Sequence, residues 1–405
     1  MWTTSITQIT YLTLPNGLVR FHIDQPKQDT VVDDFYLSIA GWVLGEKEPI
    51  EQLQLVLNNQ RISIAVTQSR PDVAQKYGQY PWAVQSGFRY RLPVQLTSGT
   101  TSLTISVMIN DASIPVAIME IHTQFVGLAI KPHHKPLMVT SLGRTGTTLC
   151  VSTLGHHPEV GITHIHPYEI RMGQEMIKHM LEALQIGNRP NLPRTLNRFF
   201  RQDYARQTIE HCINSIDHYY TALANENGQE EAHYFAEKFD PDTKQNWFYE
   251  FYPAAKEIFL VRDFRDMISS ILAFNKKRGY DAFQRQKFTS DQDFIRHLNS
   301  PHLLLKDWQA RKDRALLVTY EDFVQKPQET LTRICRYLHV DDSPKLIDNL
   351  QSLANTTSER REAHMTSASP TKSIGRWQHD LPTELIDLAH ESFGEALTEF
   401  GYEVA

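Results

Sequence analysis

A short stretch from Leu137 to Leu149, LMVTSLGRTGTTL, restricts the fold of this chain more than any other segment. It begins as an apolar run with a β-branched residue, which is the pattern of a buried strand. Two glycines and several hydroxyl side chains follow. Apolar residues then recur at helical spacing until Gly155, and Pro158 stands just beyond. The stretch therefore predicts a strand, a glycine-containing loop and a helix in direct succession.

A strand, a glycine loop and a helix in this order are suited to binding an oxyanion. Glycines let backbone N–H groups approach the anion, and the helix N-terminus adds donors and the positive end of its dipole. Arg144 contributes a fixed charge, and Thr147 and Thr148 contribute hydroxyl groups. The loop is not a Walker A motif, because Thr147 stands where that motif has a lysine. A plain strand-to-helix turn is the alternative interpretation.

The chain length of 405 residues makes two domains the natural expectation. A net charge of −6 argues against a general nucleic-acid binder. The cysteines Cys150, Cys212 and Cys335 are odd in number and widely spaced, which favours a reducing compartment. Neither a signal peptide nor an apolar run of membrane-spanning length is evident in the sequence. We therefore expect a soluble, cytoplasmic protein.

The first part of the chain, residues 1–130, predicts an all-β accessory domain. Short segments rich in branched and aromatic residues alternate there with turn signals, which is typical of a β-sandwich. These segments are residues 35–44, 53–57, 62–66, 90–96, 103–109 and 114–121. The aromatic loop at residues 70–82 suits either sugar binding or covering of the core, and packing is favoured because aromatic residues are usually packing residues. The polar, proline-containing residues 131–136 are the expected linker.

The second part, residues 137–405, predicts an α/β domain. Short apolar runs at residues 257–261 and 315–319 have the pattern of buried strands, and each is followed by a helical pattern. Longer amphipathic segments at residues 170–184 and 204–223 predict helices. Alternation of strands and helices indicates a parallel sheet.

A second anion-binding signature follows the predicted strand that ends at Val261. If a helix starts near Phe264, Ser270 lies about two turns along it. Arg262 and Ser270 would then hold one phosphate from two sides, with a charged planar fork and a hydroxyl donor. The alternative is a surface cluster in which Arg265 pairs with Asp263 or Asp266. A third basic loop, residues 372–377, contains a glycine and a tryptophan.

Together these stretches resemble the sulfotransferase family, whose donor is 3′-phosphoadenosine 5′-phosphosulfate (PAPS) and whose nucleotide product is PAP. The resemblance spans residues 137–377 and implies a P-loop-like parallel sheet flanked by helices. It implies that residues 143–148 bind the 5′-phosphosulfate and that Arg262 and Ser270 bind the 3′-phosphate. Residues 318–322, 326–327 and 373–377 match the family as well. The cofactor-binding residues so implied are Gly143, Arg144, Thr145, Gly146, Thr147, Thr148, Arg262, Ser270, Tyr320, Ser373, Gly375 and Arg376.

The resemblance also implies catalytic residues. The chain is closer to the tyrosylprotein and carbohydrate branches than to the cytosolic branch, which carries lysine where Arg144 stands. The tyrosylprotein branch places a catalytic glutamate where Glu169 stands, although a longer intervening segment leaves the register open. Another branch uses a histidine, so His166 is a second candidate for the base, together with the nearby His164. Lys238 corresponds to a lysine near the transferring group, with a surface lysine as the alternative. Arg144 and Lys238 are therefore expected to steady the bridging and equatorial oxygens of the transferring sulfuryl group.

The remaining expectations concern the leaving oxygen, metals and the acceptor. Ser367 is a weaker candidate for assisting the leaving oxygen. Histidines at 156–157, 164 and 166 lack partners at a recognisable metal-ligand spacing, so no metal is expected. The expected reaction is sulfuryl transfer to a hydroxyl group on a glycan or glycolipid. A tyrosine or small-molecule acceptor, a nucleotide kinase, and a nucleotide- or glycan-binding protein without transferase activity are the alternatives. The oligomeric state stays open.

Overall fold

The protein is described by a computed structural model over residues 2–32, 36–58, 60–93, 98–110, 112–185, 202–241, 246–354 and 365–404. The chain groups into two compact units. The first contains Met1–Ile130 and Ile177–Cys212, and the second contains Lys131–Met176 and Ile213–Ala405. The first unit thus has a boundary after residue 130, where the sequence predicted the end of the first domain. Residues 177–212, however, also belong to the first unit. The predicted division into residues 1–130, 131–136 and 137–405 therefore stays a prediction.

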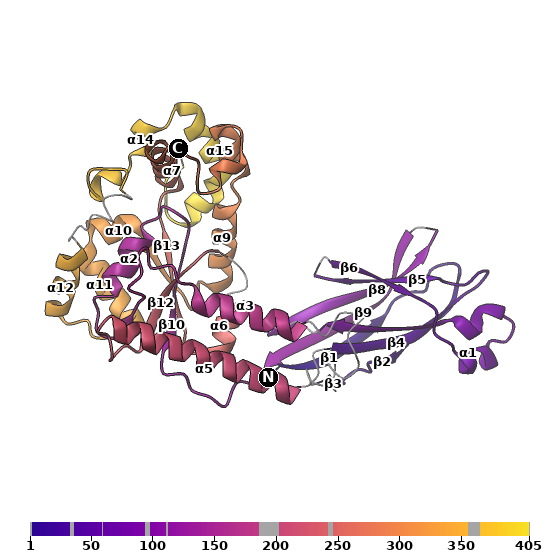
Figure 1. Ribbon diagram of the computed structural model, residues 1–405. Coiled ribbons are helices and arrows are strands. Elements are labelled where there is room, and N and C mark those ends of the chain that lie inside the picture. Colours follow the sequence, from indigo (N-terminus) through magenta and orange to yellow (C-terminus); the bar gives the residue numbers. More distant parts are fainter. Residues whose placement is uncertain are drawn as a thin grey trace. The chain divides into compact units, whose positions relative to one another are not determined.

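The first unit contains two antiparallel sheets (Figure 1). The six-stranded sheet has the order β3-β1-β9-β8-β5-β6, and the three-stranded sheet has the order β2-β4-β7. The strands are β1 (Trp2–Tyr11), β2 (Leu18–Gln25), β3 (Val31–Val32), β4 (Tyr36–Gly45), β5 (Gln52–Leu57), β6 (Gln60–Ala65), β7 (Gly87–Pro93), β8 (Gly99–Ile109) and β9 (Ala112–Phe125). Of the predicted strand residues, 35 and 94–96 lie outside the described residues.

One hydrophobic core takes side chains from both sheets. Ile6 and Ile105 of the six-stranded sheet lie in the same buried cluster as Ile39 and Phe88 of the three-stranded sheet. Strand β1 was not predicted from the sequence. One of its core-facing residues, Thr4, is buried although it is polar. Polar residues at core-facing positions weaken the apolar alternation that signals a strand.

The aromatic loop at residues 70–82 packs onto the three-stranded sheet. It forms helix α1 (Pro71–Lys76) and leads into the 3₁₀ turn η1 (Pro81–Gln85). Val73 and Ala83 are buried in a small cluster with Trp42 of β4. Trp82 Nε1 donates a hydrogen bond of 3.1 Å to the Gly45 carbonyl. The loop therefore covers apolar surface, as the sequence analysis favoured.

The second unit contains a five-stranded sheet with the order β11-β12-β10-β13-β14, and all four of its strand pairs are parallel. Its strands are β10 (Lys135–Ser141), β11 (Val160–Gly161), β12 (Tyr234–Phe239), β13 (Lys256–Val261) and β14 (Leu316–Thr319). Strand β10, which ends with the residues LMVTS, lies at the centre of this sheet. The predicted parallel α/β sheet is therefore confirmed.

Helices connect and cover these strands. They are α2 (Thr147–Leu154), α3 (Met172–Gln185), α5 (Gln202–Glu226), α6 (Asn246–Phe251), α7 (Phe264–Arg278), α8 (Asp291–His297), α9 (Ser300–Arg311), α10 (Tyr320–Gln325), α11 (Pro327–Leu338), α12 (Pro344–Ala354), α14 (Trp377–Asp380) and α15 (Thr383–Glu399). The predicted helices at 170–184 and 204–223 correspond to α3 and α5. Helix α7 begins at Phe264, as the Arg262 signature required.

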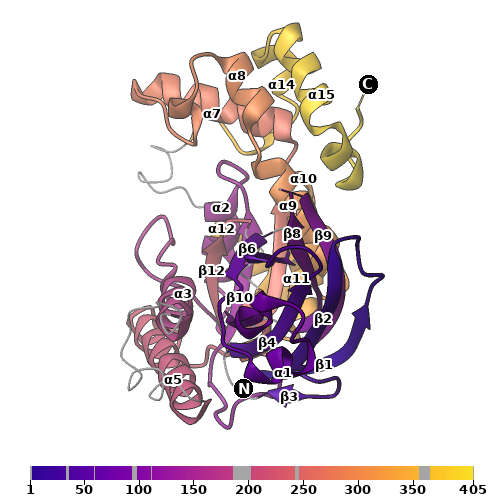
Figure 2. The ribbon, with the colours of Figure 1, turned by 90° about the vertical axis from the view of Figure 1, so that its right-hand side faces the viewer.

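Both faces of the parallel sheet are buried, which explains the continuous apolar runs of its strands. In β13, Ile258 and Leu260 belong to the core cluster with α2, α11 and α12. Phe259 and Val261 belong to the opposite cluster with α7, α8, α9 and α15. Figure 1 shows α2, α11 and α12 on one side of the strands and α9 and α15 on the other, and Figure 2 shows α7, α8, α14 and α15 gathered together.

Parallel strands place their carboxyl ends at one edge of the sheet, where ligands of such folds bind. The glycine loop follows β10, Arg262 follows β13, and Tyr320 follows β14. Lys238 is the penultimate residue of β12. The topology thus brings four segments that are distant in the sequence to the same edge.

Candidate functional site

The loop between β10 and α2 is held by its own hydroxyl groups. Thr145 Oγ1 donates a hydrogen bond of 2.7 Å to the Leu142 carbonyl, and the hydroxyls of Ser141 and Thr147 lie 2.8 Å apart. Thr145 is fully buried, so its role here is to shape the loop. The first turn of α2 follows directly, and its N–H groups lack carbonyl partners within the helix.

Two glycines are required where aromatic rings approach the loop. Gly146 has φ +91°, and a Cβ there would lie 2.3 Å from the Tyr320 ring. A Cβ on Gly143 would lie 2.6 Å from the Phe283 ring. Both positions therefore exclude larger residues. Phe283 was missed by the sequence analysis, because nothing near it in the sequence indicates a contact with a loop so far away.

Arg262 is buried at the end of β13 and ties three segments together. Its Nη1 donates a hydrogen bond of 3.1 Å to the Arg144 carbonyl, and its Nη2 donates to the Ser373 carbonyl. Its guanidinium carbon lies 4.7 Å from the centre of the Tyr320 ring, and Tyr320 Oη lies 3.0 Å from Ser373 Oγ. Arg262 Nε is buried and has no hydrogen-bond partner among the described residues. A buried, unsatisfied cationic donor of this kind suits an anionic ligand.

Arg144 lies beside Arg262 and reaches helix α7. Its Nε donates a hydrogen bond of 3.2 Å to Ser270 Oγ, and its guanidinium lies 4.7 Å from the Phe274 ring centre. Burial, together with repulsion from Arg262, lowers the pKa of Arg144 to about 10. A bound anion would relieve this repulsion. The alternative for the Arg262 segment is right about the ion pair between Arg265 and Asp263, but wrong about a surface cluster, because these residues are buried.

The basic loop of the tail completes this end of the site. Arg376 Nη1 donates a hydrogen bond of 2.9 Å to Thr366 Oγ1, which lies 3.3 Å from Ser270 Oγ. The buried Asp266 carboxylate accepts hydrogen bonds from the backbone N–H groups of Gly375 (2.7 Å) and Trp377 (2.9 Å). Asp266 therefore anchors the loop, whereas Arg265 pairs with Asp263 at 2.8 Å. Sequence reasoning missed Thr366 and gave Asp266 only a local ion pair.

A lysine–carboxylate pair lies at the other end of the site. Lys238 Nζ lies 3.1 Å from Glu169 Oε1, 2.8 Å from Thr148 Oγ1, and also donates to the Pro167 carbonyl. The Lys238 side chain is 5% exposed and that of Glu169 is 43% exposed. Burial lowers the pKa of Lys238, and the Glu169 charge opposes this shift. The surface-lysine alternative is therefore wrong.

The segment that carries Glu169 has an unusual backbone. Tyr168 and Arg171, on either side of Glu169, have φ values of +65° and +51°, which cost free energy in residues other than glycine. Arg171 forms an ion pair with Asp240. The His166 ring lies edge-on to Tyr168 with centres 5.6 Å apart. His164 pairs with the exposed Glu226 at 3.2 Å.

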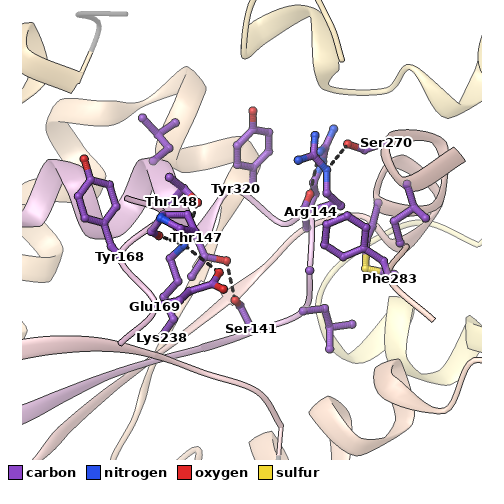
Figure 3. Close-up of a pocket in the computed structure, with 18 of the residues that line it drawn as sticks. Ser141, Arg144, Thr147, Thr148, Tyr168, Glu169, Lys238, Ser270, Phe283 and Tyr320 are labelled. Carbon is purple, nitrogen blue, oxygen red and sulfur yellow. Dashed lines mark hydrogen bonds and ion pairs between the residues drawn. The ribbon is translucent and has the colours of Figure 1, made fainter. Parts of the chain in front are cut away.

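These two ends share one cavity with a volume of about 880 Å³. Every predicted site residue lines it except Thr145, Gly375 and Arg376. Ser367 lines it as well, whereas His164 does not. Figure 3 shows Arg144 and Ser270 on one side of the glycine loop and Glu169 and Lys238 on the other.

The part of the chain that the structure describes has no group of three or more His, Cys, Asp or Glu side chains that could hold a metal ion. Both ring nitrogens of His157 have hydrogen-bond partners within the protein. One lies beside the Asp341 carbonyl, and the other accepts a hydrogen bond from the Glu159 N–H. None of the described helices combines the length and the apolar character needed to cross a membrane.

The parallel sheet, with the glycine loop and the buried Arg262 at its carboxyl edge, defines an α/β protein with a cavity at that edge. A model of the sulfotransferase family matches residues 136–344, which is just over half of the chain. The chain therefore belongs to the sulfotransferase family.

Individual relatives are distant. The chain is 24% identical to mouse carbohydrate sulfotransferase 3 over 159 residues, covering 36% of this chain and 33% of the mouse protein. It is 23% identical to the protein-tyrosine sulfotransferase of Drosophila melanogaster over 280 residues, covering 66% of this chain and 51% of the fly protein. The chain thus spans from a third to about half of the length of these relatives. Among solved structures, the sulfotransferase domain of the curacin biosynthetic pathway aligns with a TM-score of 0.42 and 17% identity, covering 68% of this chain and all of that domain.

Proposed function

We propose that this protein transfers the sulfuryl group of PAPS to an acceptor hydroxyl. The observation that carries the proposal is the single cavity in which the Arg262–Ser270 end and the Glu169–Lys238 end flank one glycine loop. A donor with phosphate groups at two positions and a reactive sulfuryl group needs basic and hydroxyl side chains at more than one place in its site.

The donor's two charged groups would bind at different parts of the cavity. Arg262, Ser270 and the tail loop with Ser373, Gly375 and Arg376 suit the 3′-phosphate, and the unsatisfied Arg262 Nε supports this assignment. The loop Gly143–Thr148 and the start of α2 suit the 5′-phosphosulfate. A P-loop-like description of the sheet and loop is part of this proposal.

The proposed reaction is a displacement at sulfur. Glu169 accepts the proton of the acceptor hydroxyl while the acceptor oxygen forms a bond to sulfur. The bond between sulfur and the 5′-phosphate oxygen breaks, and its electron pair leaves on PAP. Lys238, positioned between Glu169 and Thr148, would stabilise charge on the transferring group. His166 stays the second candidate for the base, because it lines the same cavity.

We propose a glycan or glycolipid as the acceptor. Polar side chains accompany Glu169 in the cavity lining, namely Ser152, His156, His166, Tyr168, Arg171 and Asp240. Such a wall suits a hydroxyl-rich acceptor better than an apolar one. Because the relatives are named for carbohydrate and for protein-tyrosine sulfation, a tyrosine acceptor stays the alternative. The accessory unit is proposed to be a β-sandwich, because its two sheets share one core. A cytoplasmic location stays a prediction.

Two measurements test the proposal. Calorimetric titration with PAP and with ATP should show a clear preference for PAP. Equal or stronger ATP binding would favour a nucleotide kinase. We do not expect this result, because Thr147 stands where the Walker A motif has its lysine. Incubating the protein and radiolabelled PAPS with glycan, glycolipid and peptide fractions should label the glycan or glycolipid fraction. PAP binding without labelling of any fraction would favour a nucleotide-binding protein without transferase activity.

A further inference from the structure

Strand β12 carries two adjacent charged residues that point to opposite faces of the sheet. Successive side chains of a strand alternate between its faces. Lys238 contacts Glu169. Glu237, the residue before it, instead contacts the backbone at the start of α3, three to four residues after Glu169. Adjacent residues of one rigid strand therefore hold both ends of the short segment from Glu169 to Gly173.

The contacts of Glu237 are short and buried. Its Oε1 accepts hydrogen bonds from the N–H groups of Met172 (2.8 Å) and Gly173 (3.4 Å). Its Oε2 accepts a hydrogen bond of 2.9 Å from Tyr220 Oη of helix α5. The residue is 4% exposed. A carboxyl group in this position satisfies N–H groups that have no partner within the helix.

Gly173 shows how closely these groups pack. A Cβ at this position would lie 2.2 Å from Tyr220 Oη and 3.1 Å from Glu237 Oε2. The start of α3 therefore approaches β12 as closely as a glycine backbone allows. This contact fixes the distance between the start of α3 and strand β12. It therefore also fixes the position of the end of the segment that carries Glu169.

We propose that Glu237 is a positioning residue for the transfer reaction, which holds the Glu169 segment in place through the start of α3. This inference rests on the proposed function. The Glu169 side chain is 43% exposed and accepts a hydrogen bond from Lys238, so its direction depends on the backbone that bears it. A displacement of about 1 Å at a reacting group is enough to lower turnover strongly.

Two variants test this role, with a matched control. Glu237→Gln keeps the shape but replaces one of the two acceptor oxygens with an NH₂ group, so the side chain can no longer accept hydrogen bonds from both α3 and Tyr220. Tyr220→Phe removes one donor to Glu237 and is the milder change. Tyr249→Phe is the control, because Tyr249 Oη donates a similar hydrogen bond of 2.8 Å to the buried Glu257, which does not line the cavity. Hydrogen exchange at Met172 and Gly173, PAP affinity, and kcat and KM for labelled PAPS are measured in the full-length protein.

We expect both test variants to exchange the Met172 and Gly173 amides at least about 10-fold faster. We also expect kcat to fall about 10-fold or more in Glu237→Gln, with PAP affinity and the KM for PAPS unchanged. Tyr249→Phe should change none of these values. Unchanged exchange and kcat in folded Glu237→Gln protein would overturn the inference. A wild-type protein that fails to bind PAP would instead overturn the proposed function.

Discussion

Arg144 Nε lies 3.2 Å from Ser270 Oγ and donates a hydrogen bond to it across 126 positions of the chain. The two segments that were predicted to bind phosphate are therefore in direct contact. The same contact directs the Arg144 side chain toward α7 and away from Lys238 (Figure 3). The predicted role of Arg144 at the transferring sulfuryl group stays a prediction, and it would require this side chain to change partners.

Arg262→Ala should weaken PAP binding without unfolding the protein. Loss of a charge-assisted contact to a phosphate costs about 1.5–3 kcal/mol, or about 10- to 100-fold in affinity. Calorimetry with PAP measures this change. Arg336→Ala is the control, because Arg336 is exposed and pairs with Asp342. Unchanged affinity in the folded Arg262 variant would remove the 3′-phosphate assignment.

Gly146→Ala should abolish tight PAP binding, because its Cβ would collide with the Tyr320 ring beside Arg262. Gly279→Ala is the control that distinguishes the effect of this collision from the effect of backbone strain. Gly279 also has a positive φ, +76°, but a Cβ there would meet nothing within 4 Å. We expect both variants to lose about 1 kcal/mol of stability from the left-handed backbone, while the Gly146 variant alone loses PAP affinity. Equal affinities in calorimetry would show that the loop tolerates the ring displacement.

Glu169→Gln should lower turnover about 10²- to 10⁴-fold while preserving PAP affinity. The amide is nearly the same shape but cannot accept the proton of the acceptor. His166→Ala should have a much smaller effect, and Asp342→Asn is the control for loss of a carboxylate, because Asp342 pairs with Arg336 and does not line the cavity. Steady-state turnover of labelled PAPS is the measurement. A loss confined to the histidine variant would assign the base to imidazole, and no loss in either variant would place it on another element.

A chain that begins at Lys135 should still bind PAP. All residues that line the cavity belong to the second compact unit. Residues 177–212 group with the first unit, so the shortened chain should be less stable than the full protein. Calorimetry with PAP and thermal unfolding of both chains test this. An insoluble or unfolded product would mean that the two units depend on each other for folding.

The pH dependence of stability should carry a contribution from Glu237. Burial raises the pKa of its carboxyl to about 7, although hydrogen bonds from Tyr220 and the α3 backbone and the charge of Arg171 act in the opposite direction. The native state therefore keeps this proton while the unfolded state releases it, so the contribution of Glu237 to stability falls as pH rises from about 4.5 to 7. Relative to wild type, Glu237→Gln should gain about 2 kcal/mol between about pH 5 and pH 7.5 in urea unfolding. A constant difference between the two proteins would show that the pKa of Glu237 is not raised.

Local patterns in the sequence were enough for several elements of the second unit. The strand–loop–helix at Leu137–Leu149, the helix start at Phe264 and the parallel sheet all follow from apolar spacing and from glycine positions. Such features depend on neighbours in the chain. The alignment of the strand ends follows from the parallel topology, whereas the prediction that Arg262 and Tyr320 share one site came from the resemblance to the sulfotransferase family.

The tertiary structure alone decided which side chains meet. The Lys238–Glu169 pair, the Asp266 anchor of the tail loop, the Phe283 contact with Gly143 and the Glu237 anchor of α3 all join segments far apart in the chain. In the sequence, Glu237 and Lys238 are simply two adjacent charges. Their opposite roles arise because the pleat of β12 directs one toward the cavity and the other toward α3 and α5, and burial on both faces of the sheet leaves each with a specific partner.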